Sequence, residues 1–347
     1  MGGAVSVIIP TWNGRELLEG CLLALDRQTR RPDEIIVVDN GSVDGTVPWL
    51  VTAWPDVRVV ALAQNTGFAP AVNRGIAEAT GSLLVLLNND ATADPRWLQS
   101  LADAAGSTDE AVGFFASKIV SAVDGRVESV GDVVDRAGRG RKRGYGQADD
   151  GRFDAVVEVF SACGAAAMYR QSMLARIGGF DDTFFAYYED LDLGFRALLA
   201  GYRGLLVPTA VVYHTGGVTS ARLPGLKSYL STRNAWWLLV KNLPTPLLVP
   251  VLGRFCVVST ARLLSDAGHG RLGSALRGHR DGMAGLRRIL RARRQARSLR
   301  RTGAREVWRA MPSAMLASEA RLRLATRLGA AGPHSNRRIP VSGGVDR

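Results

Sequence analysis

Apolar runs and helical patterns alternate along the first 120 residues, and this alternation limits the possible folds more than any other feature of the sequence. The apolar runs are Val5–Pro10, Glu34–Asn40, Val57–Ala63 and Ser82–Asp90. The helical patterns are Gly14–Gln28, Asp44–Trp54, Phe68–Thr80 and Asp94–Ala105. Because strands that are apolar throughout need cover on both faces, this order predicts an α/β fold with a mainly parallel sheet flanked by helices.

The pattern is less regular after Val120. Residues 124–151 are rich in Gly, Arg and Asp and contain no clear element, which predicts a mobile loop or an irregular insertion. Beyond it we expect a strand-like segment, a helix and a strand, over 156–169, 188–201 and 203–214.

Everything beyond Pro224 has a helical pattern. The expected helices cover about 224–243, 247–267, 271–300 and 303–328, and residues 331–347 are expected to be a disordered tail. We therefore divide the chain near residue 222. The body has two halves, about 1–120 and 150–222, and a helical segment follows over 223–330.

The C-terminal part is strongly basic. Residues 251–347 hold 21 Arg, no Lys and 5 acidic residues, whereas the net charge of the whole chain is +12, so the rest is slightly acidic. A basic extension suits a polyanion, either nucleic acid or the anionic face of a membrane. The three cysteines, far apart and without CxxC spacing, exclude a disulfide framework and a cysteine zinc site, and they favour a reducing compartment.

Neither a secretion signal nor a membrane span is expected. Residues 1–10 lack a basic region before their short apolar run. The apolar stretch Ala235–Leu264 is interrupted by Lys241, two arginines and three prolines, so we expect it to touch a membrane at most.

Polar turns follow each of the first four strands, at the edge of a parallel sheet where ligands bind. They read PTWNG (10–14), DNGS (39–42), NTGF (65–68) and NND (88–90). Turn formation alone explains any one of them, but the four together favour a ligand site. Gly41 and Gly45 place backbone N–H groups near a helix start, which suits a phosphate or a ribose. A GxGxxG fingerprint after the first strand is absent, which disfavours a dehydrogenase.

Asp90 ends a buried strand, where a carboxylate can hold a divalent cation that bridges phosphate oxygens. One carboxylate in the triplet Asn88-Asn89-Asp90 leaves room for a second protein ligand. His214, at the end of another apolar strand, is a candidate, although a single His is more often structural.

The densest group of acids is Glu189, Asp190 and Asp192, which follow the aromatic stretch 184–188. Acids at a helix start favour the helix dipole, and Asp192 can pair with Arg196 on the helix surface. A carboxylate beside aromatic side chains also has the partly dry surroundings of a general base.

These motifs together resemble the family 2 glycosyltransferases of the GT-A fold, especially the bacterial branch with rhamnosyltransferases of cell-wall and polysaccharide assembly. The resemblance covers about residues 4–217 and does not extend to the helical segment. The matching pieces, in order, are VSVIIPTWNG (5–14), EIIVVDNGSVDGT (34–46), NTGFAPAVNRGI (65–76), LLVLLNND (83–90), CGAAAMYR (163–170), IGGFDDTFFAYYEDLDLGFR (177–196) and VVYHTGG (211–217).

The resemblance implies which residues bind the donor. The base of the nucleotide would donate to Asp39. The triplet at 88–90 stands where the family has its DxD-type motif, so Asp90 would be the main ligand of Mg²⁺ or Mn²⁺, with His214 as the second. The implied donor-binding residues are Pro10, Thr11, Asp39, Asn65, Gly67, Asn73, Asn88, Asn89 and Asp90.

The resemblance also implies the reaction, an inverting hexosyl transfer. Asp190 would be the general base and Glu189 would position the acceptor, with Cys163, Gly164 and Ala165 on the acceptor side. One carboxylate base without a separate nucleophile suits a single displacement, and a metal would stabilise the departing diphosphate. The donor would be dTDP-rhamnose or a UDP-sugar, and the acceptor a lipid-linked glycan.

The helical segment contains two patterns typical of a membrane interface. One is an aromatic and cationic cluster, formed by Tyr229, Arg233, Asn234, Trp236, Trp237 and Lys241. The other is the basic run RRILRARRQARSLRR (287–301). They predict a cytoplasmic enzyme bound peripherally to anionic lipid on the inner face of the cell membrane, unless these helices only pack on the body.

Three alternatives remain. The chain could be an inactive scaffold with a weakened metal triplet, although Asp90, Asp190 and His214 are all present. It could bind nucleic acid through its basic tail, but no recognised nucleic-acid motif occurs, so we expect no nucleic-acid partner. It could be a nucleotidyltransferase with a similar sheet. The sequence specifies neither the sugar, the acceptor nor the oligomeric state.

Overall fold

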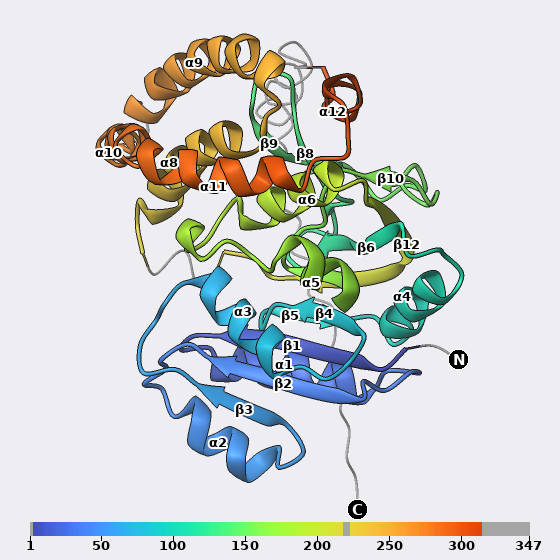
Figure 1. Cartoon of the computed structure of the whole chain (residues 1–347). Helices are drawn as coiled ribbons and strands as arrows, with labels where there is room; N and C mark the ends of the chain where they lie inside the picture. The colour runs from blue at the N-terminus through green and yellow to red at the C-terminus, as the bar shows by residue number, and fades with distance from the viewer. Residues whose placement is uncertain (1–2, 218–222, 269, 314–347) are drawn as a thin grey trace, which may run out of the picture. The chain divides into compact units, whose positions relative to one another are not determined.

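The computed structural model describes residues 3–217, 223–268 and 270–313, and its elements are shown in Figure 1. The strands are β1 (Val5–Thr11), β2 (Glu34–Asp39), β3 (Arg58–Ala61), β4 (Leu83–Leu87), β5 (Ala91–Ala93), β6 (Val112–Ser121), β7 (Val127–Ser129), β8 (Asp132–Val134), β9 (Gly140–Lys142), β10 (Glu158–Val159), β11 (Ala166–Arg170) and β12 (Arg203–His214). The helices are α1 (Arg15–Asp26), α2 (Thr46–Ala53), α3 (Phe68–Glu78), α4 (Trp97–Gly106), α5 (Gln171–Ile177), the 3-10 turn η1 (Asp182–Phe184), α6 (Glu189–Leu199), α8 (Leu226–Asn242), α9 (Thr245–Ala267), α10 (Leu272–Ala284), α11 (Leu286–Ser298) and α12 (Ala304–Ala310).

The main sheet is mixed, with its parallel part where the alternation predicted it. The strand order is β10-β12-β6-β11-β4-β1-β2-β3, with β5 on β12 and β7 on β6. Strands β4, β1, β2 and β3 run parallel, whereas β11 is antiparallel to both β4 and β6. Thr11 pairs with Asp39 at the carboxyl ends of β1 and β2, so the first two polar turns leave the sheet side by side.

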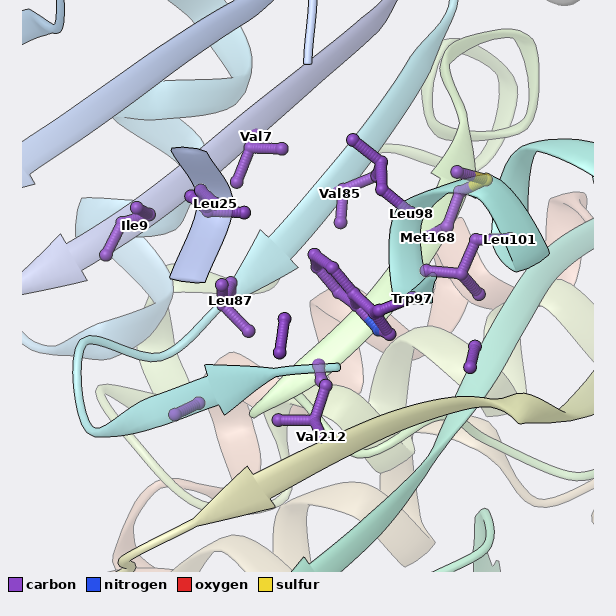
Figure 2. Packing of buried hydrophobic residues seen from close by; sticks show 14 of the residues in the cluster. Val7, Ile9, Leu25, Val85, Leu87, Trp97, Leu98, Leu101, Met168 and Val212 are labelled. Atoms are coloured by element: carbon purple, nitrogen blue, oxygen red, sulfur yellow. The ribbon is translucent and has the colours of Figure 1, made fainter. Parts of the chain in front are cut away.

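Helices cover both faces of this sheet, which confirms the α/β prediction. Val7 and Ile9 of β1 face one apolar cluster with α1 and α4, while Ile8 faces a second cluster with α3 and α5. Trp97 of α4 is fully buried in the first cluster among Val85, Leu87 and Met168, as Figure 2 shows. Its indole nitrogen donates to the Ser117 hydroxyl at 2.9 Å, so the one polar atom of the ring is paired.

The segment 124–151 is folded, and the expectation of a mobile or irregular loop was wrong. It forms β7 on the main sheet and the separate hairpin β8–β9. Val127, Val130 and Val134 are buried, because glycines with positive φ such as Gly131 and Gly144 allow tight turns between three-residue strands. Periodicity could not show strands this short.

Helix α8 packs against the body, so the aromatic and cationic cluster on it is not exposed as a membrane interface would require. Asn234, Trp237 and Lys241 are buried. The Trp237 indole donates to the Gly282 carbonyl of α10 at 3.0 Å. An apolar cluster joins α6, α8, α9, α11 and α12, and it crosses the boundary expected near residue 222.

Asp192 of α6 is fully buried, so its ion pair with Arg196 is present but is not on the helix surface. Its carboxylate also accepts from Lys241 at 2.8 Å and from Asn242 at 2.8 Å, both on α8. Burial alone would raise the pKa of Asp192, but the charges of Lys241 and Arg196 lower it to about 2. This buried group ties α6 to α8.

The last helices differ from the predicted bounds. The helix expected over 271–300 is two helices, α10 and α11, separated by Gly285. A Cβ at Gly285 would lie 2.7 Å from the Trp237 ring, so the chain turns where only glycine fits. Helix α12 ends at Ala310, so residues 311–313 of the helix expected over 303–328 are not helical. The remainder of that helix and the tail 331–347 lie outside the described residues, from 314 onward.

Candidate active site

Thr11 and Asp39 are the last residues of β1 and β2 and form a buried polar pair at the carboxyl edge of the sheet. Pro10 precedes Thr11 beside Val38 of β2. The Thr11 hydroxyl accepts from the Asn89 amide at 2.8 Å, and one Asp39 oxygen accepts from the Ser42 N–H at 3.0 Å. The other oxygen, Oδ1, is buried and has no partner in the described structure. A buried acceptor of this kind needs a donor, which an N–H of a nucleobase would supply.

The turn at 65–67 is built around one amide. Asn40 donates to the Gly67 carbonyl at 3.0 Å and to the Asn65 side chain at 3.2 Å, and it accepts from the Thr66 N–H at 2.8 Å. Gly67 has φ of +101°, and a Cβ there would lie 2.5 Å from the Phe185 ring. The glycine is therefore required for the turn to approach the segment before α6.

The side-chain amide of Asn73 is hydrogen-bonded through both its nitrogen and its oxygen. Its nitrogen donates to the Phe180 carbonyl and the Asp182 carboxylate, both at 2.6 Å, and its oxygen accepts from the Phe180 N–H at 2.9 Å. Its place is thus beside the loop that leads to α6. Any influence of Asn73 on a donor would act through that loop.

Asp90 and His214 lie together because β5 pairs with β12. His214 aligns with Ala91 in this pair. Its Nε2 is 3.0 Å from Asp90 Oδ1 and 3.4 Å from the Asn88 side-chain nitrogen. A carboxylate oxygen and a ring nitrogen that face each other are a suitable donor set for Mn²⁺ or Mg²⁺, provided that substrate phosphates complete the coordination. The two ligands expected from the sequence are therefore brought together.

Glu128, on β7, orients His214 and was not found by the sequence reasoning. Its Oε2 is 2.8 Å from His214 Nδ1, and its Oε1 accepts from Lys142 at 2.6 Å. A carboxylate on the far nitrogen of a ligating His is a common feature of metal sites. A three-residue strand in a Gly-rich segment offered no signal for this residue.

The pKa values of this group reflect its ion pairs. Burial opposes ionisation of Glu128, but the hydrogen bond to His214 and the charge of Lys142 lower its pKa to about 2. Burial alone would lower the pKa of His214. The hydrogen bonds to Asp90 and Glu128 outweigh this effect and raise the pKa to about 9. The chain thus provides a negative environment in which a cation at His214 Nε2 is favoured.

Glu189 and Asp190 are the first residues of α6. Asp190 Oδ2 accepts from the Gly164 N–H at 3.2 Å, and the Asp190 carbonyl accepts from the Ser161 hydroxyl at 2.7 Å. Burial raises the pKa of Asp190 and that of Glu189, and the charge of Asp190 raises the latter further. A carboxylate with a raised pKa is suited to accept a proton. One Glu189 oxygen is buried without a partner in the described structure.

The turn at Cys163–Ala165 lies between the two groups of acids. The Gly164 N–H reaches Asp190, and the Ala165 carbonyl accepts from the Asn88 N–H at 2.9 Å. One short piece of backbone therefore links the Asp90 triplet to the proposed base. Cys163 is buried, which raises its pKa and disfavours a thiolate nucleophile.

Asp132, on β8, is a second acid beside Asp190 that the sequence reasoning missed. Its carboxylate, the Cys163 thiol and the Asp190 carboxylate lie within 4.8 Å of one another. Burial and the charge of Asp190 raise the pKa of Asp132 to about 7. Lys142, opposite Asp132 in the β8–β9 pair, supplies the nearby positive charge.

Comparison with known proteins identifies the family of the chain. The family model described as Glycosyl transferase family 2 matches residues 6–178, and that of Glycosyl transferase family group 2 matches residues 142–258. The chain is 29% identical over 249 residues to an N-acetylglucosaminyl-diphospho-decaprenol L-rhamnosyltransferase of Mycobacterium tuberculosis, covering 65% of this chain and 80% of that protein. It is 29% identical over 226 residues to the O-antigen chain rhamnosyltransferase of Salmonella typhimurium, covering 62% and 67%.

A solved structure shares the fold. It is that of a mannosyltransferase from Pyrobaculum calidifontis in complex with GDP-Man and Mn²⁺, with a TM-score of 0.51 and 20% identity. The likeness covers 89% of this chain and 88% of that one, so it includes helices beyond residue 222.

Proposed function

Because the chain belongs to glycosyltransferase family 2 and is rhamnosyltransferase-like, we propose that it moves a sugar from a nucleotide-sugar to a hydroxyl of a lipid-linked glycan. The donor is dTDP-rhamnose or a UDP-sugar, and the product belongs to cell-wall or polysaccharide synthesis. The observation that carries the proposal is the Gly164–Ala165 backbone, which bonds to both the Asp90 triplet and Asp190.

The donor binds at the carboxyl edge of the parallel strands. The unpaired oxygen of Asp39 accepts from the nucleobase, and the turns at Thr11 and Gly67 shape the site around the nucleoside. Asp90 and His214 would hold Mg²⁺ or Mn²⁺, which would supply positive charge to the departing diphosphate. Glu128 keeps the His214 ring in place.

Asp190 acts as the general base. It takes the proton of the acceptor hydroxyl as that oxygen forms its bond to the anomeric carbon, while the bond from this carbon to the diphosphate breaks and the diphosphate departs with the electron pair. The Gly164 N–H orients the Asp190 carboxylate for this transfer. The attack on the face opposite the leaving group inverts the configuration.

A panel of dTDP-, UDP- and GDP-sugars tests the reaction class. With Mn²⁺ or Mg²⁺ and a bacterial lipid extract, we expect the wild-type protein to release nucleotide from one donor and to label a lipid with its sugar. Release of pyrophosphate with formation of a nucleotide-sugar would identify a nucleotidyltransferase instead. A protein that neither binds nor consumes any of these nucleotides would be an inactive scaffold.

Membrane association is the second part of the proposal. Among the described residues, α9 is the one helix whose length and apolar composition would allow it to cross a membrane. One such helix is weak evidence for a membrane span. Its side chains Val249 and Val257 are 78% and 72% exposed, and Arg254 is exposed on the same helix. We propose that α9 lies on the cytoplasmic face of the cell membrane, with the exposed arginines of α10 and α11 attracted to anionic lipid.

Vesicle sedimentation measures this association. We expect binding to phosphatidylglycerol vesicles at low salt, weaker binding at high salt, and a loss of about tenfold or more in the double variant Val249→Asp and Val257→Asp, because charges cannot enter the apolar layer. Val123→Asp is the matched control, since Val123 is 79% exposed on the body. Equal binding of the double variant and the wild type would contradict a role for α9.

A further inference from the structure

The backbone just before Glu189 and Asp190 is in an unusual conformation. Phe185, Tyr187 and Tyr188 have φ of +66°, +66° and +74°, in the left-handed region that non-glycine residues rarely adopt. Each such residue is strained and persists only where its surroundings hold it. Three of them in four residues therefore require a strong external constraint.

That constraint is Asn234, a fully buried residue in the middle of α8. Its amide nitrogen donates to the carbonyls of Phe184 and Ala186, both at 2.9 Å, and of Tyr187 at 2.7 Å. The two N–H groups of one neutral amide thus face three backbone carbonyls of the strained segment, so that one N–H is shared between two of them. The carbonyls of a regular turn would not converge on one donor in this way.

Arg233 fixes the direction of that amide. Its Nε donates to Asn234 Oδ1 at 2.9 Å, so the Asn234 nitrogen must face the segment. A terminal nitrogen of Arg233 donates to the Phe184 carbonyl at 2.9 Å. The guanidinium lies 4.3 Å from the centre of the Trp237 ring, which holds it in place from the other side.

The segment held by these two residues contacts both halves of the reaction site. The Phe185 carbonyl accepts from the Ala69 N–H at 3.1 Å, and its ring lies against Gly67 of the donor turn. Tyr188 is the N-cap of α6, whose second residue is Asp190. A shift of the segment would therefore move the base relative to the donor.

We propose that Arg233 and Asn234 are positioning residues for Asp190, so that α8, which lies beyond the sequence motifs at 4–217, is part of the catalytic apparatus. This inference rests on the proposed function, because it assigns Asp190 as the base. A misplacement of a catalytic group by about 1 Å can cost about 10²-fold in rate. Arg233 and Asn234 provide that precision because their hydrogen bonds hold three strained residues in one conformation.

Two variants test the role of Asn234. Asn234→Ala removes the donor, and Asn234→Asp keeps the shape but places a carboxylate against three carbonyls. Trp236→Phe is the control, because the Trp236 indole on the same helix donates to His279 of α10 at 2.8 Å and not to the segment or to α6. All rates are expressed per nucleotide-binding site, counted by calorimetric titration. Unfolded protein therefore does not lower the kcat.

We expect both Asn234 variants to lower kcat by about 10²-fold, with a much smaller change in the KM of the donor. Hydrogen exchange of the amides of 185–190 should become at least about tenfold faster, since these amides are no longer held in one conformation. Trp236→Phe should change neither quantity beyond about threefold. A wild-type kcat in Asn234→Ala, or an equal loss in Trp236→Phe, would overturn the proposal.

The exchange measurement separates this proposal from the proposed function. If the wild-type protein transfers no sugar, the proposed function fails. The exchange rates still show whether Asn234 holds the segment 185–190. Faster exchange confined to 185–190 in the Asn234 variants would then support the proposal that Asn234 holds this segment. Unchanged exchange would overturn it in an active or an inactive protein.

Discussion

We expect the Asp190→Asn variant to lose about 10³-fold or more in kcat for sugar transfer, within the range for loss of a general base. The amide keeps the size of the side chain and can still contact the Gly164 N–H through its oxygen, but it cannot accept the proton of the acceptor hydroxyl. We expect donor binding, measured by calorimetry, to remain within about threefold of the wild type. Asp103→Asn is the control for a neutralised acid, since Asp103 is exposed on α4.

The pH profile of the wild type gives independent support. Burial raises the pKa of Asp190. Below this pKa the carboxyl is protonated and cannot act as a base, so kcat should fall as the pH falls through the raised value and be restored above it. This limb should be absent from the residual activity of Asp190→Asn. Retention of more than a tenth of the wild-type kcat in this variant would show that another group, such as Asp132 or Glu189, takes the proton.

Removal of divalent metal is the second large effect. We expect transfer to cease with excess chelator and to return on addition of Mn²⁺ or Mg²⁺. Asp90→Ala and His214→Ala should each lower kcat at fixed metal concentration by about 10²-fold or more, because the diphosphate loses several kcal/mol of charge stabilisation. The two residues face each other at 3.0 Å, so the two variants should have similar phenotypes.

Glu128→Gln separates the ring orientation from direct ligation. Glu128 lies 2.8 Å from the far nitrogen of His214, and loss of such a partner typically weakens metal binding about 10–100-fold. We therefore expect activity to recover at high Mn²⁺ in Glu128→Gln but not in Asp90→Ala. Undiminished transfer by the wild type in chelator would contradict the metal proposal as a whole.

The parallel half of the sheet could be predicted because each of its strands has a local signature. Val5–Thr11 is mostly apolar and Leu83–Leu87 is apolar throughout. Parallel pairing places Thr11, at the end of the first strand, and Asp90, after the second, at one edge of the sheet. The segment 184–190 was also recognisable, since acids that follow aromatic residues at a helix start are unusual. These inferences needed only short-range patterns.

The remainder depends on contacts that no local pattern encodes. Glu128, Asp132 and Lys142 come from strands of three residues, too short for a periodicity. Arg233 and Asn234 look like residues of a membrane interface in the sequence, because polar side chains among tryptophans are typical of both an interface and a buried hydrogen-bond network. Only the position of α8 against the strained segment distinguishes the two.

The pairing of β5 with β12 also determines when the site can form during folding. Asp90 and His214 are separated by 124 positions in the chain, and their contact depends on the alignment of His214 with Ala91. Contacts of such long range close late, because the loop between them must first lose its entropy. A chain still under synthesis therefore has no Asp90–His214 pair until β12 has emerged, long after the edge of β1 and β2 that carries Thr11 and Asp39 can assemble.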